Sequence, residues 1–438
     1  MGNSRASHGV LPLAVRATPI TRHDADSSSW AHPLCCHAGA LHSPLVIPTI
    51  ARKPISLMDF SLSPEQLELV ESVRAFARDQ LGGAVEPRDA AGELWREGWQ
   101  RCADFGIPGL PVPSEYGGQD AGMLSTLLAM EALGYGCRDN GLVFSLNAQM
   151  WSCMIPLAHF GTEDQKRRYL PSLCDGSRIG VHAITEPDAG SDAFSGRARA
   201  VRDGDHYVLD GQKTFITNAP VADLIVVFAR LFDGARDRGL TAFLVERGTP
   251  GLTQSTAFSK MGLRTSPLGE VIVEGCRVHE TNRLGPEGAG ERVFHSSMDW
   301  ERTCIFAAHL GQMERQLEDS IRYARKRRQF GKPIAKYAQV ADKLVDAKVR
   351  IEAARWLLYY TGWLKDAGRS SMMAASVAKL FTSEAHVQNT LDALQIHAGY
   401  GYMTESGVER EVRDALAGRI FSGTSDMQRK ILASFLGL

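Results

Sequence analysis

The chain has 438 residues, of which 44% are hydrophobic and 23% charged, and this composition is typical of a folded enzyme and excludes disorder along most of the chain. Its 49 lysines and arginines balance 50 aspartates and glutamates to a net charge of -1, which excludes a general attraction to nucleic acid or anionic lipid. The eight cysteines include no C-x-x-C pair, and no segment approaches the roughly 18 apolar residues of a membrane span. We therefore expect a soluble, cytoplasmic protein without a metal site, a nucleic-acid partner or a membrane partner.

The first 57 residues differ from the rest, because they are rich in Ser, His, Pro and Ala and show neither helical nor strand periodicity. One interpretation is an organellar transit peptide, since basic residues outnumber acidic ones in this segment. The other, which we prefer, is a start codon assigned too early, with Met58 as the natural initiator, because patterned sequence begins at the next residue. Residues 1–57 are thus expected to be a disordered tail or the product of a mis-assigned start.

Helical patterns fill the region from 58 to 178. Ser63 and Gln66 form a capping box with a proline at the first helical position, and apolar residues then recur at helical spacing. Further helical segments are predicted at 125–135 and 163–174. This region is expected to be an N-terminal helical domain.

From residue 179 the pattern changes to short β-branched runs separated by Gly, Asp and Asn, which is typical of strands. The runs lie at 207–209, 224–228, 241–245 and 271–273. They predict a middle β domain over residues 179–290.

Long helical patterns return after residue 290. They cover 292–326, interrupted only by Gly311, and then 338–366 and 371–396. These patterns predict a C-terminal helix bundle over residues 291–438.

Two segments of the β domain carry the residue types of a ligand-binding loop. The segments are TEPDAGSD at 185–192 and GQKTFITN at 211–218. The hydroxyls of Thr185 and Thr217 lie next to tight turns, and Phe215 could pack on a flat polar ring such as isoalloxazine. The residues alone favour the alternative of two surface hairpin loops.

These two loops resemble the flavin-binding signatures of the acyl-CoA dehydrogenase family, and the resemblance extends over residues 58–438. It is also carried by LPVP at 110–113 with EYGG at 115–118, KMGLR at 260–264, RRQFGKP at 327–333 and GTSDMQR at 423–429. The resemblance implies an α+β fold with an N-terminal helical domain, a middle β-barrel-like domain and a C-terminal four-helix bundle. It also implies FAD as the cofactor, and a homo-oligomer, usually a tetramer, because FAD in this family reaches across a subunit boundary.

The resemblance assigns FAD contacts to two groups of residues. In the β domain they are His182, Ile184, Thr185, Ser191, Phe215 and Thr217. In the C-terminal bundle they are Arg327, Gln329, Gln339, Gln395, Gly399, Thr424 and Asp426. Most of the second group would come from a neighbouring subunit, where the forked guanidinium of an arginine suits a pyrophosphate. Without the family context, the basic run at 325–328 would be interpreted as a solvated helix face. The chain departs from the family at His182, where Tyr is common, and at Phe215, where Trp is common. A commonly seen Gln is replaced by Ala338 one residue before Gln339.

The catalytic base is the most informative departure. Most relatives have Glu immediately before the Gly-Thr of the C-terminal signature, but this chain has Ser422 there, and serine cannot take a proton from carbon. A second solution in the family places the base on the first C-terminal helix, and the residue 29 positions before Phe330 is Glu301. The resemblance therefore implies Glu301 as the base, although a glutamate beside Arg302 would otherwise be interpreted as half of a surface ion pair. Substrate contacts are expected from Ser191, Asp299, Arg302 and Ser422.

The segments at 296–302, 313–317 and 421–428 are similar to a subset of the family that oxidises acyl groups on carrier proteins, including prolyl and glyceryl groups. The expected function is FAD-dependent α,β-dehydrogenation of an acyl thioester on a carrier protein, with an electron-transfer flavoprotein or oxygen as acceptor. One alternative is an acyl-CoA dehydrogenase of fatty-acid or branched-chain catabolism. Two others are a flavin monooxygenase or nitroalkane-type oxidase on the same fold, and a flavin-binding protein without catalysis.

Overall fold

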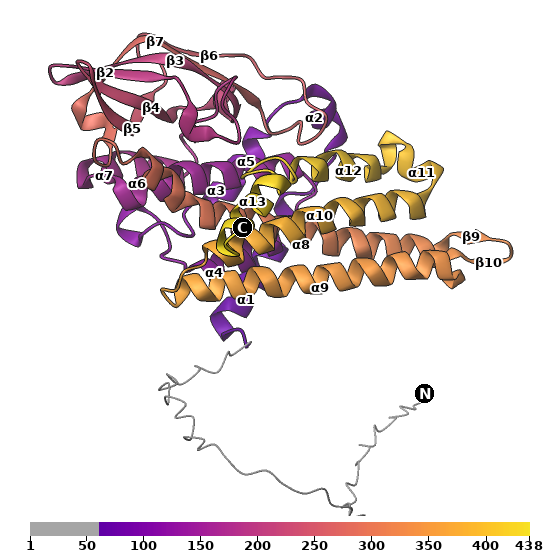
Figure 1. Cartoon of the computed structure of the whole chain (residues 1–438). Helices are drawn as coiled ribbons and strands as arrows, with labels where there is room; N and C mark the ends of the chain where they lie inside the picture. The colour runs from indigo at the N-terminus through magenta and orange to yellow at the C-terminus, as the bar shows by residue number, and fades with distance from the viewer. Residues whose placement is uncertain (1–60) are drawn as a thin grey trace, which may run out of the picture. The chain divides into compact units, whose positions relative to one another are not determined.

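The computed structural model describes residues 61–438, so the expectation for residues 1–57 lies outside the described residues. Along this part of the chain, helices come first, a β-sheet follows, and long helices complete the fold, as Figure 1 shows. The predicted α+β fold is confirmed. None of the helices between residues 61 and 438 is both long and apolar enough to cross a membrane.

The N-terminal helices begin at the predicted capping box. The Ser63 hydroxyl accepts a hydrogen bond from the backbone N–H of Gln66, and the Gln66 side chain accepts one from the backbone N–H of Ser63. The helices are α1 (Pro64–Gln80), α2 (Glu86–Ala91), α3 (Arg96–Asp104), α4 (Met123–Gly136), α5 (Asn140–Gln149), α6 (Ile155–Phe160) and α7 (Glu163–Cys174). A π-helical segment, Met150–Met154, joins α5 to α6. Almost every residue from α5 to the start of α6 is buried, so this stretch has little surface open to solvent.

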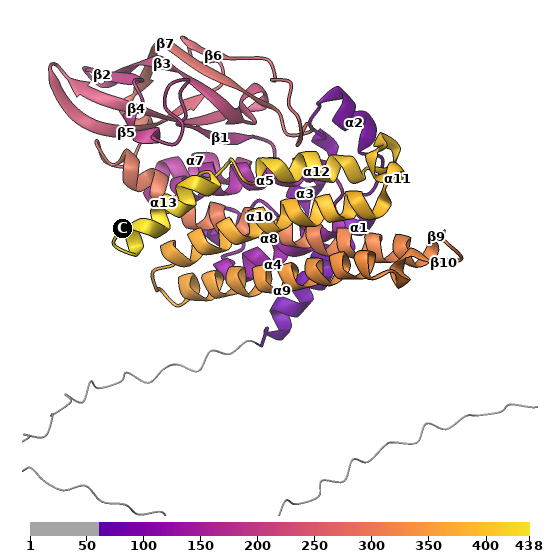
Figure 2. The same ribbon diagram turned by 45° about the vertical axis from the view of Figure 1, so that its right-hand side comes forward.

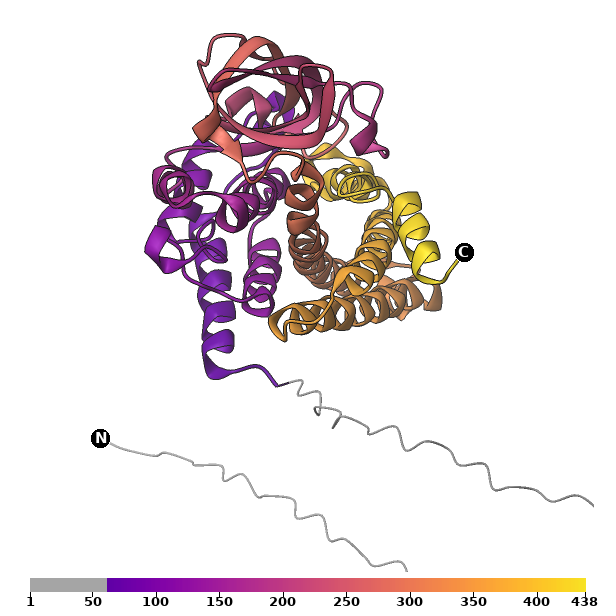
Figure 3. The ribbon, with the colours of Figure 1, turned by 60° about the vertical axis from the view of Figure 1, so that its left-hand side comes forward.

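The sheet has eight strands and is strongly curled, as Figure 3 shows. The strands are β1 (Gly180–Ala183), β2 (Arg199–Asp203), β3 (His206–Thr217), β4 (Leu224–Asp233), β5 (Arg236–Glu246), β6 (Leu252–Gln254), β7 (Leu268–His279) and β8 (Arg283–Leu284). The order is β6-β7-β3-β2-β4-β5-β8, and β1 pairs with β4 in parallel. All four predicted β-branched runs lie in strands. In Figure 2 the sheet covers α5 and α7.

Three long helices form the main part of the C-terminal region. The long helices are α8 (Gly290–Lys326), α9 (Ala338–Asp366) and α10 (Met372–His397), and three shorter ones follow: α11 (Gly399–Tyr402), α12 (Val408–Ala417) and α13 (Ser425–Phe435). A small hairpin of β9 (Arg328–Gln329) and β10 (Lys332–Pro333) joins α8 to α9. The helix α8 continues through Gly311, where the sequence pattern was interrupted. A Cβ atom at Gly311 would lie 2.0 Å from the Glu131 carbonyl oxygen, so this glycine permits the close approach of α4 and does not break α8.

A buried polar network connects α4, α8 and α12. The Arg315 guanidinium on α8 donates to the carbonyls of Gly134 and Cys137 at the end of α4, at 2.6 Å each. It also forms a 3.0 Å ion pair with Glu411 on α12. One side chain thus satisfies helix-end carbonyls that α4 itself leaves without partners.

Asp414 extends this network from α12 toward the sheet. Its carboxylate accepts hydrogen bonds from Asn140 at 3.0 Å and from the backbone N–H of Leu263 at 2.5 Å. Burial raises the pKa of Asp414 to about 7, because the desolvation of its charge outweighs these hydrogen bonds.

We expect the Asp414→Asn variant to lose less stability than the wild type as the pH rises. Because the folded pKa is raised, the contribution of the protonated carboxyl is fully present below the unfolded pKa of about 3.9 and is lost as the pH rises through about 7. Guanidinium unfolding of both proteins at about pH 6 and about pH 8.5 checks this. Equal losses of unfolding free energy in the two proteins would contradict it.

Candidate active site

A cavity of about 490 Å³ lies where the sheet meets the helices. Its walls come from α5 and the π-helical segment, β1 and the loop after it, the end of β3, the loop before β7, α8, and the turn between α12 and α13. Nine of the residues predicted from the sequence line it. They are His182, Ile184, Thr185, Ser191, Phe215, Thr217, Glu301, Ser422 and Thr424. The fold therefore brings together residues that are up to 242 positions apart in the chain.

The Glu301 carboxylate is asymmetrically bound in this cavity. Its Oε1 atom accepts a 2.6 Å hydrogen bond from the Ser422 hydroxyl, whereas its Oε2 atom is buried and has no partner within residues 61–438. Glu301 is therefore not part of a surface ion pair. A buried carboxylate with one free oxygen is able to accept a proton from a molecule in the cavity.

His182 lies close enough to Glu301 for the carboxylate charge to influence the pKa of the imidazole. Burial lowers the pKa of His182, although the negative charge of Glu301 acts in the opposite direction. The imidazole is therefore neutral near pH 7. Its Nδ1 atom is buried without a partner in the described part of the chain, so the cavity contains a second polar atom free to bind a ligand.

The turn that carries Ser422 has a strained backbone that two side chains stabilise through hydrogen bonds. Ser422 has φ 56°, in the left-handed region that costs a residue with a Cβ atom about 1–2 kcal/mol. The Ser422 carbonyl accepts hydrogen bonds from Arg302 at 3.3 Å and from Gln428 at 3.2 Å. Phe215 and Leu263, which line the same cavity, also have positive φ angles, of 56° and 47°. Strain of this kind tends to concentrate at functional sites.

A buried ion pair supports the loop after β1. The Lys213 ammonium lies 2.7 Å from the Glu186 carboxylate and also donates to the Ile184 carbonyl at 3.1 Å. Glu186 accepts two further bonds from the backbone N–H groups of Arg197 and Ala198. These contacts fix the backbone on both sides of Thr185, which lies between the residues they hold.

The residues of this loop and of the end of β3 present unused hydrogen-bonding groups beside an aromatic face. Within residues 61–438, the hydroxyls of Thr185, Ser191 and Thr217 make no hydrogen bonds. The Phe215 side chain is 64% exposed. An aromatic ring beside several free hydroxyls suits a flat, polar heterocycle, and the donor set therefore fits an isoalloxazine ring.

The inner wall of the cavity was missed by the sequence analysis. It includes Phe144 and Ala148 of α5, Ser152 of the π-helical segment, and Ile305 of α8. The Phe144 ring lies 4.6 Å from the ring of Phe421, centroid to centroid. Because α5 is buried nearly all round, its pattern does not distinguish a residue that faces a cavity from one that faces the core.

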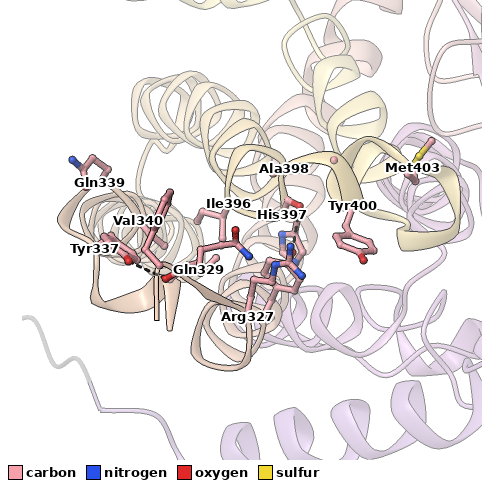
Figure 4. Close-up of a pocket in the computed structure, with 14 residues that line it drawn as sticks. Arg327, Gln329, Tyr337, Gln339, Val340, Ile396, His397, Ala398, Tyr400 and Met403 are labelled. Carbon is pink, nitrogen blue, oxygen red and sulfur yellow. Dashed lines mark hydrogen bonds between the residues drawn. The ribbon is translucent and has the colours of Figure 1, made fainter. Parts of the chain in front are cut away.

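A second pocket, of about 760 Å³, lies at the far end of the long helices and shares no lining residue with the first. Arg327, Gln329, Gln339 and Gly399 line it, and Figure 4 shows Arg327 near Gln329 and Tyr400. The Arg327 guanidinium lies 5.6 Å from the centre of the Tyr400 ring. Thus four residues expected to contact FAD are grouped away from the cavity that holds Glu301.

The other four predicted residues line neither pocket. Asp299 accepts hydrogen bonds from Ser371 at 2.8 Å and from Lys365 at 3.4 Å. It lies outside the cavity because residues two apart on a helix, such as Asp299 and Glu301, do not face the same side. Arg302 is buried against the Ser422 turn. Asp426 is exposed and pairs with Arg429, and Gln395 is exposed on α10.

Three family models match the chain in succession. They are the acyl-CoA dehydrogenase N-terminal domain over residues 63–177, the middle domain over 182–276 and the C-terminal domain over 288–437. The L-prolyl-[peptidyl-carrier protein] dehydrogenase of Pseudomonas fluorescens is 43% identical over 87% of this chain and 100% of its own length.

Solved structures give the same result. The crystal structure of the prolyl acyl carrier protein oxidase AnaB superimposes with a TM-score of 0.84 at 47% identity, over 86% of this chain and 100% of AnaB. The structure of PigA with FAD and proline has a TM-score of 0.84 at 40% identity, over 87% of this chain and 100% of PigA. With the helix–sheet–helix order and the three successive domain matches, these likenesses confirm the predicted resemblance: the chain belongs to the acyl-CoA dehydrogenase family.

Proposed function

We propose that this protein is an FAD-dependent dehydrogenase that oxidises the α–β carbon bond of an acyl group held as a thioester on a carrier protein. The observation that carries the proposal is the Glu301 carboxylate, which lies at the cavity with its Oε2 atom buried and without a partner among residues 61–438. The similarity to enzymes named for prolyl-carrier proteins supports the choice of carrier.

Residues around the first cavity would hold the flavin ring. Thr185, Ser191 and Thr217 offer hydroxyls and Phe215 an exposed aromatic face, with further contacts from His182, Ile184 and Thr424, which line the same cavity. When bound, FAD supplies the acceptor for the β-hydride of the substrate.

The protein residues handle the α-proton. Oε2 of Glu301 takes it, and a positioned general base of this kind contributes roughly 10²–10⁴-fold to the rate. Phe144, Phe421 and Ile305 give the cavity an apolar lining, and the exclusion of water by a bound substrate there would strengthen electrostatic interactions inside it. Burial lowers the pKa of His182, so its imidazole is a weaker competitor for this proton than an exposed histidine would be.

The substrate we propose is a prolyl thioester, because the polar Nδ1 atom of His182, a residue that lines this mainly apolar cavity, has no partner within residues 61–438. A ring nitrogen next to the α-carbon would give this atom a hydrogen-bond partner, whereas a hydrocarbon ring would leave it unsatisfied, at a cost of about 1–3 kcal/mol. The alternative is an acyl-CoA of similar size.

The test mixes the oxidised holoenzyme anaerobically with prolyl-carrier protein, cyclopentanecarbonyl-carrier protein and the two matching CoA thioesters. We expect rapid loss of flavin absorbance with prolyl-carrier protein, and a rate at least about tenfold lower with the nitrogen-free ring. Faster bleaching with the CoA thioesters than with the carrier-protein thioesters would show that the enzyme is an acyl-CoA dehydrogenase. No bleaching with any of the four would refute the dehydrogenase.

The electron acceptor is proposed to be oxygen or an electron-transfer flavoprotein. One similar protein is named an oxidase, which supports oxygen. Hydrogen peroxide released in stoichiometry with the product, without added flavoprotein, identifies oxygen as the acceptor; product formation that depends on the flavoprotein identifies the other.

The second pocket is proposed to complete the FAD site of another copy of this chain. Arg327 and Gln329 would meet the pyrophosphate there, and the residues around Gly399 would meet the adenosine half, with Gln339, Gln395 and Asp426 as further contacts of the C-terminal region. The exposed apolar side chains of Val345, Val349 and Tyr360 on α9 support self-association, because contact between apolar surface and water is unfavourable. A homo-oligomer, and in this family a tetramer, would cover them.

We expect Arg327→Gln to weaken FAD binding without altering the cavity that contains Glu301. A charge-assisted, bidentate contact to phosphate is lost, so the dissociation constant of FAD should rise roughly 10–100-fold. Fluorescence titration of the apoprotein with FAD measures it. Arg325→Gln, a neighbouring change outside the pocket, serves as the control, and equal affinity of all three proteins would argue against a shared site.

A further inference from the structure

The Ser422 hydroxyl has a single proton, and that proton is already donated to the base. The distance from Oγ to Oε1 of Glu301 is 2.6 Å, within the range of about 2.5–2.7 Å for hydroxyl hydrogen bonds to ionised oxygens. A hydroxyl carries one donor hydrogen. In this arrangement Ser422 has no hydrogen left to donate to a thioester carbonyl.

The bond leaves the two carboxylate oxygens in different states. Oε1 of Glu301 is held by Ser422, whereas Oε2 is buried and unpartnered within residues 61–438. A carboxylate without such a bond could rotate about its last side-chain torsion, which has a broad energy profile. The serine therefore restricts the base to one orientation.

The backbone at Ser422 does not explain the choice of a serine. Its φ of 56° is unfavourable for a residue with a Cβ atom, and a glycine would adopt it without strain. The turn is kept in place by hydrogen bonds from buried Arg302 and Gln428 to its carbonyls. The contact that a glycine could not make is the hydroxyl bond to Glu301.

We infer that Ser422 is a positioning residue for the catalytic base: its hydroxyl fixes Oε1 of Glu301 and so presents Oε2 as the acceptor of the substrate's α-proton. The inference rests on the proposed function, in which Glu301 is that base. It replaces the expectation that Ser422 contacts the substrate directly.

The test isolates proton removal from oxidation. Methoxyacetyl-carrier protein, deuterated at the α-carbon, has oxygen in the β position, so it can exchange its α-deuterons with solvent but cannot lose a β-hydride. The oxidised holoenzyme and its Ser422→Ala and Ser422→Gly variants are incubated with this thioester over a range of substrate concentration. Mass spectrometry follows the loss of deuterium, and flavin absorbance confirms equal FAD content.

Both variants lack the hydroxyl, but only the alanine retains the backbone strain. We expect the two to lower the maximal exchange rate by the same factor, roughly tenfold, as for one hydrogen bond to a charged group. The half-saturating substrate concentration should stay within about twofold, since no substrate contact is lost.

Three outcomes would overturn the inference. Wild-type exchange in Ser422→Gly but not in Ser422→Ala would assign the effect to the backbone. A weaker apparent affinity with an unchanged maximal rate would show that Ser422 contacts the substrate. Wild-type maximal rates in both variants would show that the bond has no role. Failure of the wild type to bleach with prolyl-carrier protein would count against the proposed oxidation, whereas the exchange still reports on Glu301 and Ser422.

Discussion

Glu301→Gln should lower the rate of anaerobic flavin reduction by roughly 10²–10⁴-fold, because the amide cannot accept the α-proton that a positioned general base removes. The change is nearly isosteric, and the Ser422 hydroxyl can still donate to the amide oxygen at the place of Oε1. The fold and FAD content should therefore be unchanged. Stopped-flow absorbance of the bound flavin, after mixing with prolyl-carrier protein, measures the rate.

Asp299→Asn provides the matched control. This carboxylate lies on the same helix, two residues from Glu301, but it is bound to Lys365 and Ser371 and lines neither pocket. Its removal should leave the bleaching rate within about twofold of the wild type. Full activity of Glu301→Gln would exclude this base, and a comparable loss in Asp299→Asn would show that the rate responds to any carboxylate removed from α8.

Lys213→Met should destabilise the protein by about 3–5 kcal/mol, because it leaves the Glu186 carboxylate buried without its counter-charge. Lys213 is 2% exposed and Glu186 is 9% exposed. Burial opposes the ionisation of Glu186, but the hydrogen bond and charge of Lys213 hold its pKa below the usual range. Since these two residues hold the loop around Thr185, the variant should also lose FAD.

Two comparisons separate the buried pair from a general effect of charge. Arg277→Met removes a cation from an ion pair with Asp203 in the same sheet, where both side chains are more than half exposed, and should cost less than about 1 kcal/mol. The double variant Lys213→Met, Glu186→Gln should recover much of the lost stability, because it leaves no unpaired charge. Denaturant unfolding of the four proteins measures these differences. A loss in Lys213→Met no greater than in Arg277→Met would contradict the expectation.

Much of the fold follows from local sequence patterns. The capping box at Ser63 begins α1, the β-branched runs lie in strands, and the predicted helix at 338–366 coincides with α9. These features depend on hydrogen bonds and side-chain periodicity within a few residues, so the sequence contains them directly. The glycine at 311 is the exception, because its role depends on the approach of α4.

The candidate site was predictable where the resemblance supplied the spacing. The family pattern has Glu where this chain has Ser422, and its second solution places Glu where this chain has Glu301. The structure joins the side chains of these two residues by a hydrogen bond. The inner wall at Phe144 and Ser152 was not predictable, because a buried helix gives the same pattern whether it borders a cavity or the core. The assignment of roles to these residues stays a prediction.

The sequence by itself determined which segments become helices and strands, the family, and the two positions among which the base had to be sought. Only the tertiary structure decided that Glu301 lines the cavity with one oxygen unpartnered in the described part of the chain, that Asp299 faces Lys365, and that Lys213 reaches Glu186. The physical reason is that local structure depends on neighbours in the chain, whereas the burial and pairing of a charged side chain depend on segments that fold against it from far away in the sequence.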